Sequence, residues 1–295
     1  MSKIFFLLNP SQPKRQWDLR ELAAQTAHRR GWTARFGQVE RDRPQSSERL
    51  LRQALEEDCS RLVVVGGDGT LHRAINGLHH LKKLPSLEVA VVPAGTCNDF
   101  ARALGLFPTH LEEAFESACV DHPCETDLGR IDGELFINNA GFGRRITNAA
   151  KRAKPLKTLR SFSPVTLRAT WEKGSIEGTF FMAMACNAPF FSRGYYFSKN
   201  PRVNDGLLDI FLLPTMAKWK LLPLLLMGRL GRPVRSRHMV MLKVHALNIE
   251  SDGDLWPQAD GEPPAGAVRR ISFEVAPEKA MIIAPSHSKT ISLWG

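Results

Sequence analysis

The sequence predicts two domains: an α/β domain with a parallel sheet flanked by helices, followed by a β-rich, mainly antiparallel domain. Up to about residue 125, apolar runs that suit buried strands alternate with stretches whose apolar residues recur at helical spacing. Beyond it, short apolar runs such as 135–137 and 179–185 are separated by Gly, Pro and Asn clusters, which is typical of antiparallel strands. We therefore place the domains at 1–125 and 126–284, with a tail at 285–295 that we expect to return to the first domain.

Composition and charge restrict the class of protein. Of the 295 residues, 43% are hydrophobic and 24% charged, which is typical of a folded globular protein and argues against disorder. The formal net charge of +10 predicts an anionic partner: a nucleotide, a nucleic acid or a lipid surface. The five cysteines are scattered and form no CxxC pair, which indicates free thiols in a reducing cytoplasm. No apolar run approaches the roughly twenty residues that a bilayer-spanning helix needs.

The first elements follow from apolar runs and capping residues. The apolar run at residues 4–8 predicts the first strand, and a helix is expected after it, to about residue 30. A second strand around 32–39 precedes a helix that Ser46 or Ser47 caps. Strands and helices therefore already alternate before the glycine-rich turn at residues 66–70.

The glycine-rich turn lies between an apolar strand, residues 62–65, and a helix, residues 71–80. Its glycines allow a ligand to approach the backbone, and the N–H groups of the turn and of the new helix form an anion site. A strand, a glycine turn and a helix N-terminus together predict phosphate binding. The turn consists of Gly66, Gly67, Asp68, Gly69 and Thr70.

Asp68 makes the prediction more specific. Its carboxylate would repel phosphate groups unless a cation stood between them, and Mg²⁺ is the expected mediator. The alternative is a plain strand-to-helix turn in which Asp68 and Thr70 only cap the helix. His72 lies just after the glycine turn, and an exposed helix position is expected for it rather than a contact with phosphate.

A second turn of small residues repeats the arrangement. The strand at 87–92 is followed by the segment Pro93–Ala101, which contains Gly95 and leads into another helix. Ligands of parallel sheets gather at the carboxyl ends of the strands, and both turns occur at such ends. We therefore expect the two turns to contribute to one site.

Four segments taken together resemble the diacylglycerol kinase catalytic family, in particular its soluble bacterial lipid kinase branch. The segments are Gly66–Thr70, Pro93–Ala101, Asn204–Asp209 and Asp260–Glu262, and their order covers nearly the whole chain. The first is shared with NAD kinases and phosphofructokinases, whereas the second is more specific to lipid kinases.

The resemblance implies a nucleotide-binding α/β domain, a β-rich acceptor domain and an active site in the cleft between them. It implies that ATP and Mg²⁺ bind along both glycine turns, with Asp68 setting the geometry of metal and phosphates. In the family, the Glu of the Asp-Gly-Glu motif is taken as proton acceptor, here Glu262, and Asp260 would be its electrostatic partner. The implied nucleotide-binding residues are Gly66, Gly67, Asp68, Gly69, Thr70, Gly95, Thr96 and Asn98.

The resemblance also implies a structural Mg²⁺ held by the Asp205 carboxylate and the backbone carbonyls of Arg202 and Leu207. For both Asp-Gly pairs, at 205–206 and at 260–261, an ordinary turn remains the alternative, because Asp-Gly is a common hairpin signal.

Basic segments with apolar residues between them predict contact with an anionic membrane surface. Between Arg144 and Lys173 there are nine Lys or Arg residues against the single acid Glu172. A second pairing joins the apolar stretch 219–227 to arginines at 229, 232, 235 and 237; a core helix with a solvated basic edge is the alternative. No recognisable reader motif supports nucleic-acid binding.

The sequence therefore predicts an ATP-dependent lipid kinase that transfers the γ-phosphoryl group to a diacylglycerol-like or other long-chain alcohol. We expect it to be cytoplasmic and peripherally associated with membranes. Two alternatives remain: a soluble-substrate kinase of the NAD kinase type, and a non-catalytic lipid- or nucleotide-binding regulator on the same fold.

Overall fold

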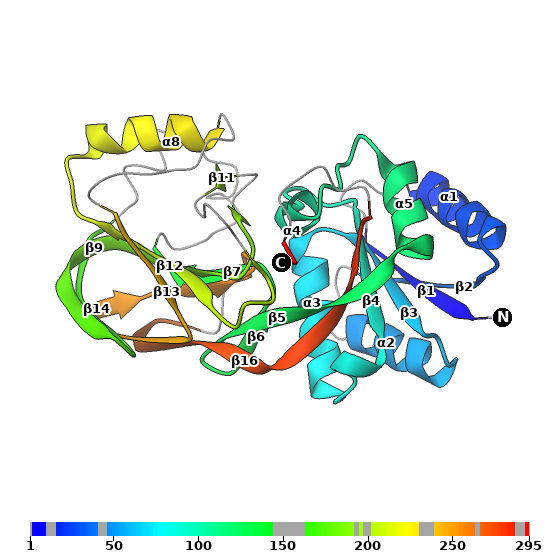
Figure 1. Ribbon diagram of the computed structural model, residues 1–295, viewed down its shortest axis with the longest axis horizontal. Coiled ribbons are helices and arrows are strands. Elements are labelled where there is room, and N and C mark those ends of the chain that lie inside the picture. Colours follow the sequence, from blue (N-terminus) through cyan, green and yellow to red (C-terminus); the bar gives the residue numbers. More distant parts are fainter. Residues whose placement is uncertain are drawn as a thin grey trace. The chain divides into compact units, whose positions relative to one another are not determined.

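The computed structural model describes most of the chain, as two compact units (Figure 1). One unit comprises Met1–Asp127 and Pro277–Gly295, and the other Leu128–Ala276. These limits differ from the predicted 1–125 and 126–284 because the strands β5 (His122–Ile131) and β16 (Val268–Ala284) each run from one unit into the other. The described residues are 2–9, 16–40, 46–143, 163–191, 195–196, 202–229, 239–262, 266–286 and 293–294.

The first unit contains the predicted parallel sheet. Its strand order is β16-β4-β3-β1-β2, and every pairing in it is parallel. Both faces of the central strands are buried, as their near-continuous apolar runs require. The strands besides β16 are β1 (Lys3–Leu8), β2 (Thr33–Gln38), β3 (Arg61–Gly66) and β4 (Glu88–Pro93).

Helices cover both faces of this sheet (Figure 1). Helices α1 (Gln16–Arg29) and α5 (Leu111–Val120) lie on one face, and α2 (Ser46–Glu56) and α3 (Asp68–His80) on the other. The short helices η2 (Leu84–Ser86) and α4 (Asp99–Ala103) lie before and after β4 along the chain. The apolar residues of α3 at 71, 74, 75 and 78 are all buried, which is the i, i+3, i+4, i+7 stripe that the sequence shows.

The arrangement of β1 places a topological switch point in the sheet. Strand β1 pairs with β2 on one side and with β3 on the other, so the chain leaves it in opposite directions. Ligands of open α/β sheets bind outside the carboxyl ends of the strands at such a point. The first glycine turn follows β3 directly and therefore lies at this edge.

The second unit is the predicted β-rich, mainly antiparallel domain. Its main path is β13-β12-β9-β8-β14-β16, with β5 pairing β16 and β6, and β7 pairing β9 and β15. A separate two-stranded ribbon joins β10 (Phe190–Phe191) to β11 (Tyr195–Tyr196). The other strands are β6 (Glu134–Phe136), β7 (Asn139–Phe142), β8 (Val165–Trp171), β9 (Gly174–Cys186), β12 (Leu208–Pro214), β13 (Val240–Val244), β14 (Ala246–Leu255) and β15 (Pro257–Ala259).

Alternating side chains of these strands enter two different clusters. Leu208, Ile210 and Leu212 of β12 belong to the main core, whereas Phe211 packs in a second cluster with residues of α8 (Leu221–Arg229). The period of two residues is that of a strand with both faces covered. The 3-10 helix η3 (Lys218–Lys220) precedes α8. None of the described helices is long and apolar enough to cross a bilayer.

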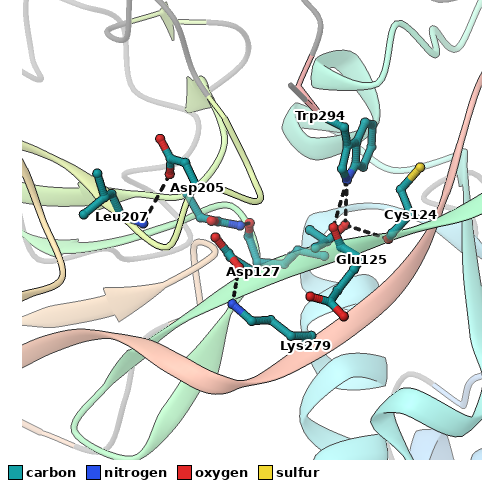
Figure 2. A network of polar contacts seen from close by, with 10 residues as sticks. Cys124, Glu125, Asp127, Asp205, Leu207, Lys279 and Trp294 are labelled. Atoms are coloured by element: carbon teal, nitrogen blue, oxygen red, sulfur yellow. Dashed lines mark hydrogen bonds and ion pairs between the residues drawn. The ribbon is translucent and has the colours of Figure 1, made fainter.

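Within the first unit, polar contacts join β5 to the C-terminal part of the chain (Figure 2). The Trp294 indole donates to the Glu125 carbonyl and to Thr126 Oγ1, both at 3.2 Å. Lys279 of β16 forms an ion pair with the buried Asp127 carboxylate. These contacts hold β5, β16 and residue 294 together within this unit.

Candidate active site

The two glycine turns lie against each other. Strands β3 and β4 are in register from Arg61 to Gly66, so that Gly66 is opposite Pro93. The Ala94 N–H donates to the Gly66 carbonyl at 3.0 Å. A Cβ on Gly95 would lie 2.2 Å from Gly67 Cα, a distance that excludes any side chain there. The glycines are therefore required by backbone-to-backbone packing, and the turns form one surface at the carboxyl edge of the sheet.

Asp68 connects the first turn to the second. Its Oδ1 accepts a hydrogen bond from the Phe100 N–H, at the start of α4, at 3.0 Å. Helix α3 begins with Gly67 as its N-cap and has no side-chain capping bond. Asp68 therefore makes a contact beyond its own helix, to the second turn. The half-buried carboxylate lies where both turns meet.

Thr70 is positioned by a residue that the sequence analysis does not single out. The Asn9 side-chain amide donates to Thr70 Oγ1 at 2.9 Å, and the Asn9 backbone N–H donates to the Val65 carbonyl at 2.8 Å. Asn9 directly follows β1, the strand next to β3. Its place at the same sheet edge is the signal that would have identified it.

Asn98 shapes the second turn. It adopts the left-handed conformation (φ 55°, ψ 43°), which Asn tolerates better than most residues. Its Oδ1 accepts from the Gly95 N–H at 2.9 Å and its Nδ2 donates to the Gly95 carbonyl at 3.0 Å. The side chain is buried and closes the turn, whereas Thr96 is exposed. Of these two predicted nucleotide-binding side chains, Thr96 is the accessible one.

The prediction for His72 is wrong. It is expected at an exposed position, but its side chain is buried on α3. The helix begins at Asp68, three residues earlier than predicted, and its buried side includes His72 as well as the apolar stripe.

These residues suit an anionic ligand with a divalent cation. At the start of α3 the helix dipole places partial positive charge where backbone N–H groups point out of the helix. The adjoining Asp68 offers the carboxylate oxygen that Mg²⁺ prefers. The donor set therefore fits a magnesium-bound phosphate group, with amides for the phosphate oxygens and Asp68 for the metal.

In the second unit, Asp260 and Gly261 form a two-residue hairpin turn. Both have positive φ, 48° and 83°, as a type I′ turn requires. Ala259 and Glu262 exchange both backbone hydrogen bonds, at 2.9 and 2.8 Å. The ordinary-turn alternative is therefore correct for the backbone, and the half-buried Glu262 leaves the turn from a fixed position.

The Asp260 carboxylate has a structural task. It is buried and accepts three backbone N–H groups, from Ile137 at 3.1 Å, Asn138 at 2.9 Å and Asn139 at 3.0 Å. This arrangement anchors the turn to the start of β7. The Asn-Asn pair after the apolar run 135–137 is the feature that the sequence analysis missed.

Of the predicted metal ligands, the Asp205 carboxylate has hydrogen-bond partners in the structure. Asp205 Oδ1 accepts the Leu207 N–H at 3.2 Å (Figure 2), and Asp205 Oδ2 accepts the Lys243 ammonium at 2.6 Å. Arg202 is exposed. Among the described residues, no group of three or more His, Cys, Asp or Glu could hold a metal ion. An ammonium therefore lies beside the single carboxylate of this predicted site, and the Mg²⁺ site stays a prediction.

Much of the predicted membrane-binding sequence lies outside the described residues. This holds for 144–162 of the basic stretch 144–173, and for the arginines at 232, 235 and 237. The same is true of the segment at 10–15 that follows Asn9.

Comparison with known proteins matches both units. The model of the "Diacylglycerol kinase catalytic domain" covers residues 3–131, and that of the "YegS C-terminal NAD kinase beta sandwich-like domain" covers 139–284. A protein of Pseudomonas aeruginosa named "Probable lipid kinase YegS-like" is 31% identical over 262 residues, 82% of each chain. The "Diacylglycerol kinase" of Bacillus subtilis is 24% identical over 225 residues, 72% of this chain and 74% of that one.

The fold has a solved counterpart. The crystal structure of a diacylglycerol kinase from Bacillus anthracis str. Sterne superimposes with a TM-score of 0.78 over 97% of each chain at 18% identity. The α/β unit with its glycine turns and the β-rich unit together have the fold of this structure. The chain belongs to the diacylglycerol kinase catalytic family, with the YegS-like lipid kinases among its relatives, as its sequence motifs predict.

Proposed function

We propose that this kinase uses ATP and Mg²⁺ to phosphorylate the hydroxyl of a diacylglycerol-like or other long-chain lipid alcohol. The observation that carries the proposal is the contact between Gly67 and Gly95, which merges two glycine turns at the switch-point edge of the sheet. Phosphoryl transfer needs little covalent chemistry from the protein, because positioning and charge neutralisation supply most of the rate. Backbone donors, a metal-binding carboxylate and one base are sufficient for it.

In the first unit, the amides of Gly67 and Gly69 would hold phosphate oxygens, and Thr96 would contact the nucleotide from the second turn. The Thr70 N–H donates to the Gly67 carbonyl at 2.9 Å. Asp68 would hold Mg²⁺, which supplies the positive charge that the phosphates need. The hydrogen bond from Phe100 keeps that carboxylate oriented.

In the second unit, Glu262 would take the proton of the acceptor hydroxyl. Its backbone is fixed by the paired bonds to Ala259, and the turn itself is fixed by the buried Asp260. A positioned general base contributes roughly 10²- to 10⁴-fold to a rate. Asp260 would therefore act by positioning the turn rather than by touching substrate.

The test is to incubate the purified chain with γ-labelled ATP, Mg²⁺ and a total lipid extract, and to identify the labelled product. Label in a lipid supports the proposal. Label in a soluble acceptor such as NAD, without lipid, would support the NAD kinase alternative, and lipid binding without any labelled product would support the regulator.

Two variants separate the proposed roles. Glu262→Gln should keep the nucleotide-induced rise in melting temperature and lose about 100-fold or more in kcat. Asp68→Asn should lose both the Mg²⁺-dependent part of that rise and turnover. The exposed Glu250→Gln is the matched control, because it removes one carboxylate from the same unit without touching the turn. A Glu262→Gln enzyme that turns over like Glu250→Gln would contradict the base assignment.

Peripheral membrane contact is the second part of the proposal. Leu221 and Leu224 of α8 pack into the sheet, whereas Trp219 and Leu226 are 68% and 59% exposed. Exposed Trp and Leu beside the exposed Lys220 suit the headgroup region of an anionic bilayer.

The membrane proposal is tested by co-sedimentation with phosphatidylglycerol-rich and phosphatidylcholine-only vesicles. We expect binding to the anionic vesicles, and weaker binding for a Trp219→Ser, Leu226→Ser variant. Equal binding of this variant and the wild type would refute the contribution of η3 and α8. Val120→Ser is the control, because it removes an exposed apolar side chain from the other unit.

A further inference from the structure

The loop at 202–207 is held by an ammonium group. The Asp205 carboxylate accepts the Leu207 N–H through one oxygen and the Lys243 ammonium through the other, at 3.2 and 2.6 Å. The N–H of Leu207, rather than its carbonyl, thus faces the carboxylate. Each carboxylate oxygen thus accepts a hydrogen bond, and the donor on Oδ2 is itself a cation.

The backbone register fixes the place of Lys243. Strand β13 pairs antiparallel to β12, and Lys243 lies directly opposite Asp209. Its Nζ is 3.8 Å from Asp209 Oδ1 as well as 2.6 Å from Asp205 Oδ2. Opposite charges on facing positions of paired strands attract each other. One cation on β13 thus lies close to two carboxylates at the start of β12.

The partial burial of these carboxylates favours a cation beside them. The Asp205 and Asp209 side chains are only 21% and 15% exposed, so water screens their mutual repulsion poorly. A divalent ion at this point would meet the positive charge of Lys243 and would need oxygen ligands in near-octahedral geometry. The ammonium satisfies the same charge requirement with hydrogen bonds.

We propose that Lys243 replaces a structural divalent cation at the 202–207 loop, so that the loop keeps its conformation without metal. This inference concerns the loop in the second unit and is independent of which acceptor the kinase uses. Its test requires no activity.

The experiment measures thermal unfolding of the full chain without nucleotide, in EDTA and in increasing MgCl₂. The wild-type melting temperature should change by less than about 1 °C. Lys243→Met should melt lower in EDTA and recover in a saturable, Mg²⁺-dependent way, whereas Lys243→Arg should behave like the wild type. Lys173→Met, which removes an exposed cation from the same unit, is the matched control.

A direct count of bound Mn²⁺ by electron paramagnetic resonance does not depend on how well the Lys243 variant folds. Wild type and Asp205→Asn should bind the same number of Mn²⁺ ions. Loss of one ion on Asp205→Asn, or a saturable Mg²⁺ stabilisation of the wild type that Asp205→Asn abolishes, would overturn the proposal. So would a Lys243→Met protein that melts in EDTA like Lys173→Met.

Discussion

Gly95→Ala tests whether contact between the two glycine turns is required for nucleotide binding. The added Cβ would lie 2.2 Å from Gly67 Cα, 2.6 Å from Gly67 N and 2.8 Å from Asn98 Oδ1. Two of these three atoms are backbone and cannot rotate away. To restore van der Waals contact, the turns must separate by more than about 1 Å.

A separation of that size should affect catalysis more than stability. Overpacking costs typically about 1–3 kcal/mol of unfolding free energy. A displacement of about 1 Å in a positioned site can cost about 100-fold in rate. We therefore expect Gly95→Ala to fold, to lose most of the nucleotide-induced rise in melting temperature, and to lose about 100-fold in kcat/KM in the labelled-ATP assay.

Gly77→Ala is the matched control. Its Cβ would lie 2.5 Å from Leu51 Cδ1, a comparable overlap within the same unit. The clash there involves the end of a flexible side chain between α2 and α3, away from both turns. Gly77→Ala should therefore melt differently from wild type yet keep its kcat/KM. If Gly95→Ala keeps nucleotide binding and turnover within about threefold of Gly77→Ala, contact between the turns is not what binds the nucleotide.

Three further predictions concern groups whose environments the structure defines. Asp260→Asn places an NH₂ group against the Ile137 N–H, so equilibrium unfolding should show a loss of roughly 1–3 kcal/mol, the cost of an orphaned buried donor. A hydrogen bond from Arg29 lowers the pKa of Glu116 below 4.5, so its contribution is present above pH 4.5 and lost as the pH falls through the folded-state pKa. Glu116→Gln should therefore flatten the stability profile in that acid range. Burial raises the pKa of Cys119 to about 11, so mass spectrometry should detect its alkylation at pH 8 only after unfolding.

The elements that the sequence predicts correctly are those with local causes. The run 62–65 is apolar because β3 is buried on both faces. Glycines follow it because the backbone of Gly67 packs closely against Gly95. The stripe on α3 has helical spacing because one face of that helix is buried. In each case the residues that determine the structure are neighbours in the chain.

Side-chain partners that are distant in the sequence could not be predicted in this way. Asp68 accepts from Phe100, 32 residues later, and Asn9 donates to Thr70, 61 residues later. Each contact depends on the order β4-β3-β1, which brings strand ends together, and no local pattern specifies that order. The glycine-turn motif therefore predicts a phosphate site, but it does not predict which groups orient Asp68 and Thr70.

The loop at 202–207 is a second case in which the partner of a side chain could not be predicted from the local sequence. Its Asp-Gly motif is compatible with a metal ligand, and the residue that occupies the cation's place is 38 positions further along the chain. A single-residue shift of β13 would turn Lys243 to the other face of the sheet. Whether this carboxylate meets an ammonium or a metal is thus decided by strand register, which the motif does not contain.

The two carboxylates of the Asp-Gly-Glu turn, Asp260 and Glu262, lie in different environments although they are close in the sequence. Asp-Gly alone explains a hairpin, but an exposed hairpin would not require the Asp to be buried under three N–H groups. That burial ties the turn to the start of β7 and leaves the oxygens of Asp260 engaged with backbone donors. Glu262 is only half-buried and shares its backbone bonds with Ala259. Substitution of Asp260 should therefore act mainly through stability, and substitution of Glu262 mainly through the chemical step.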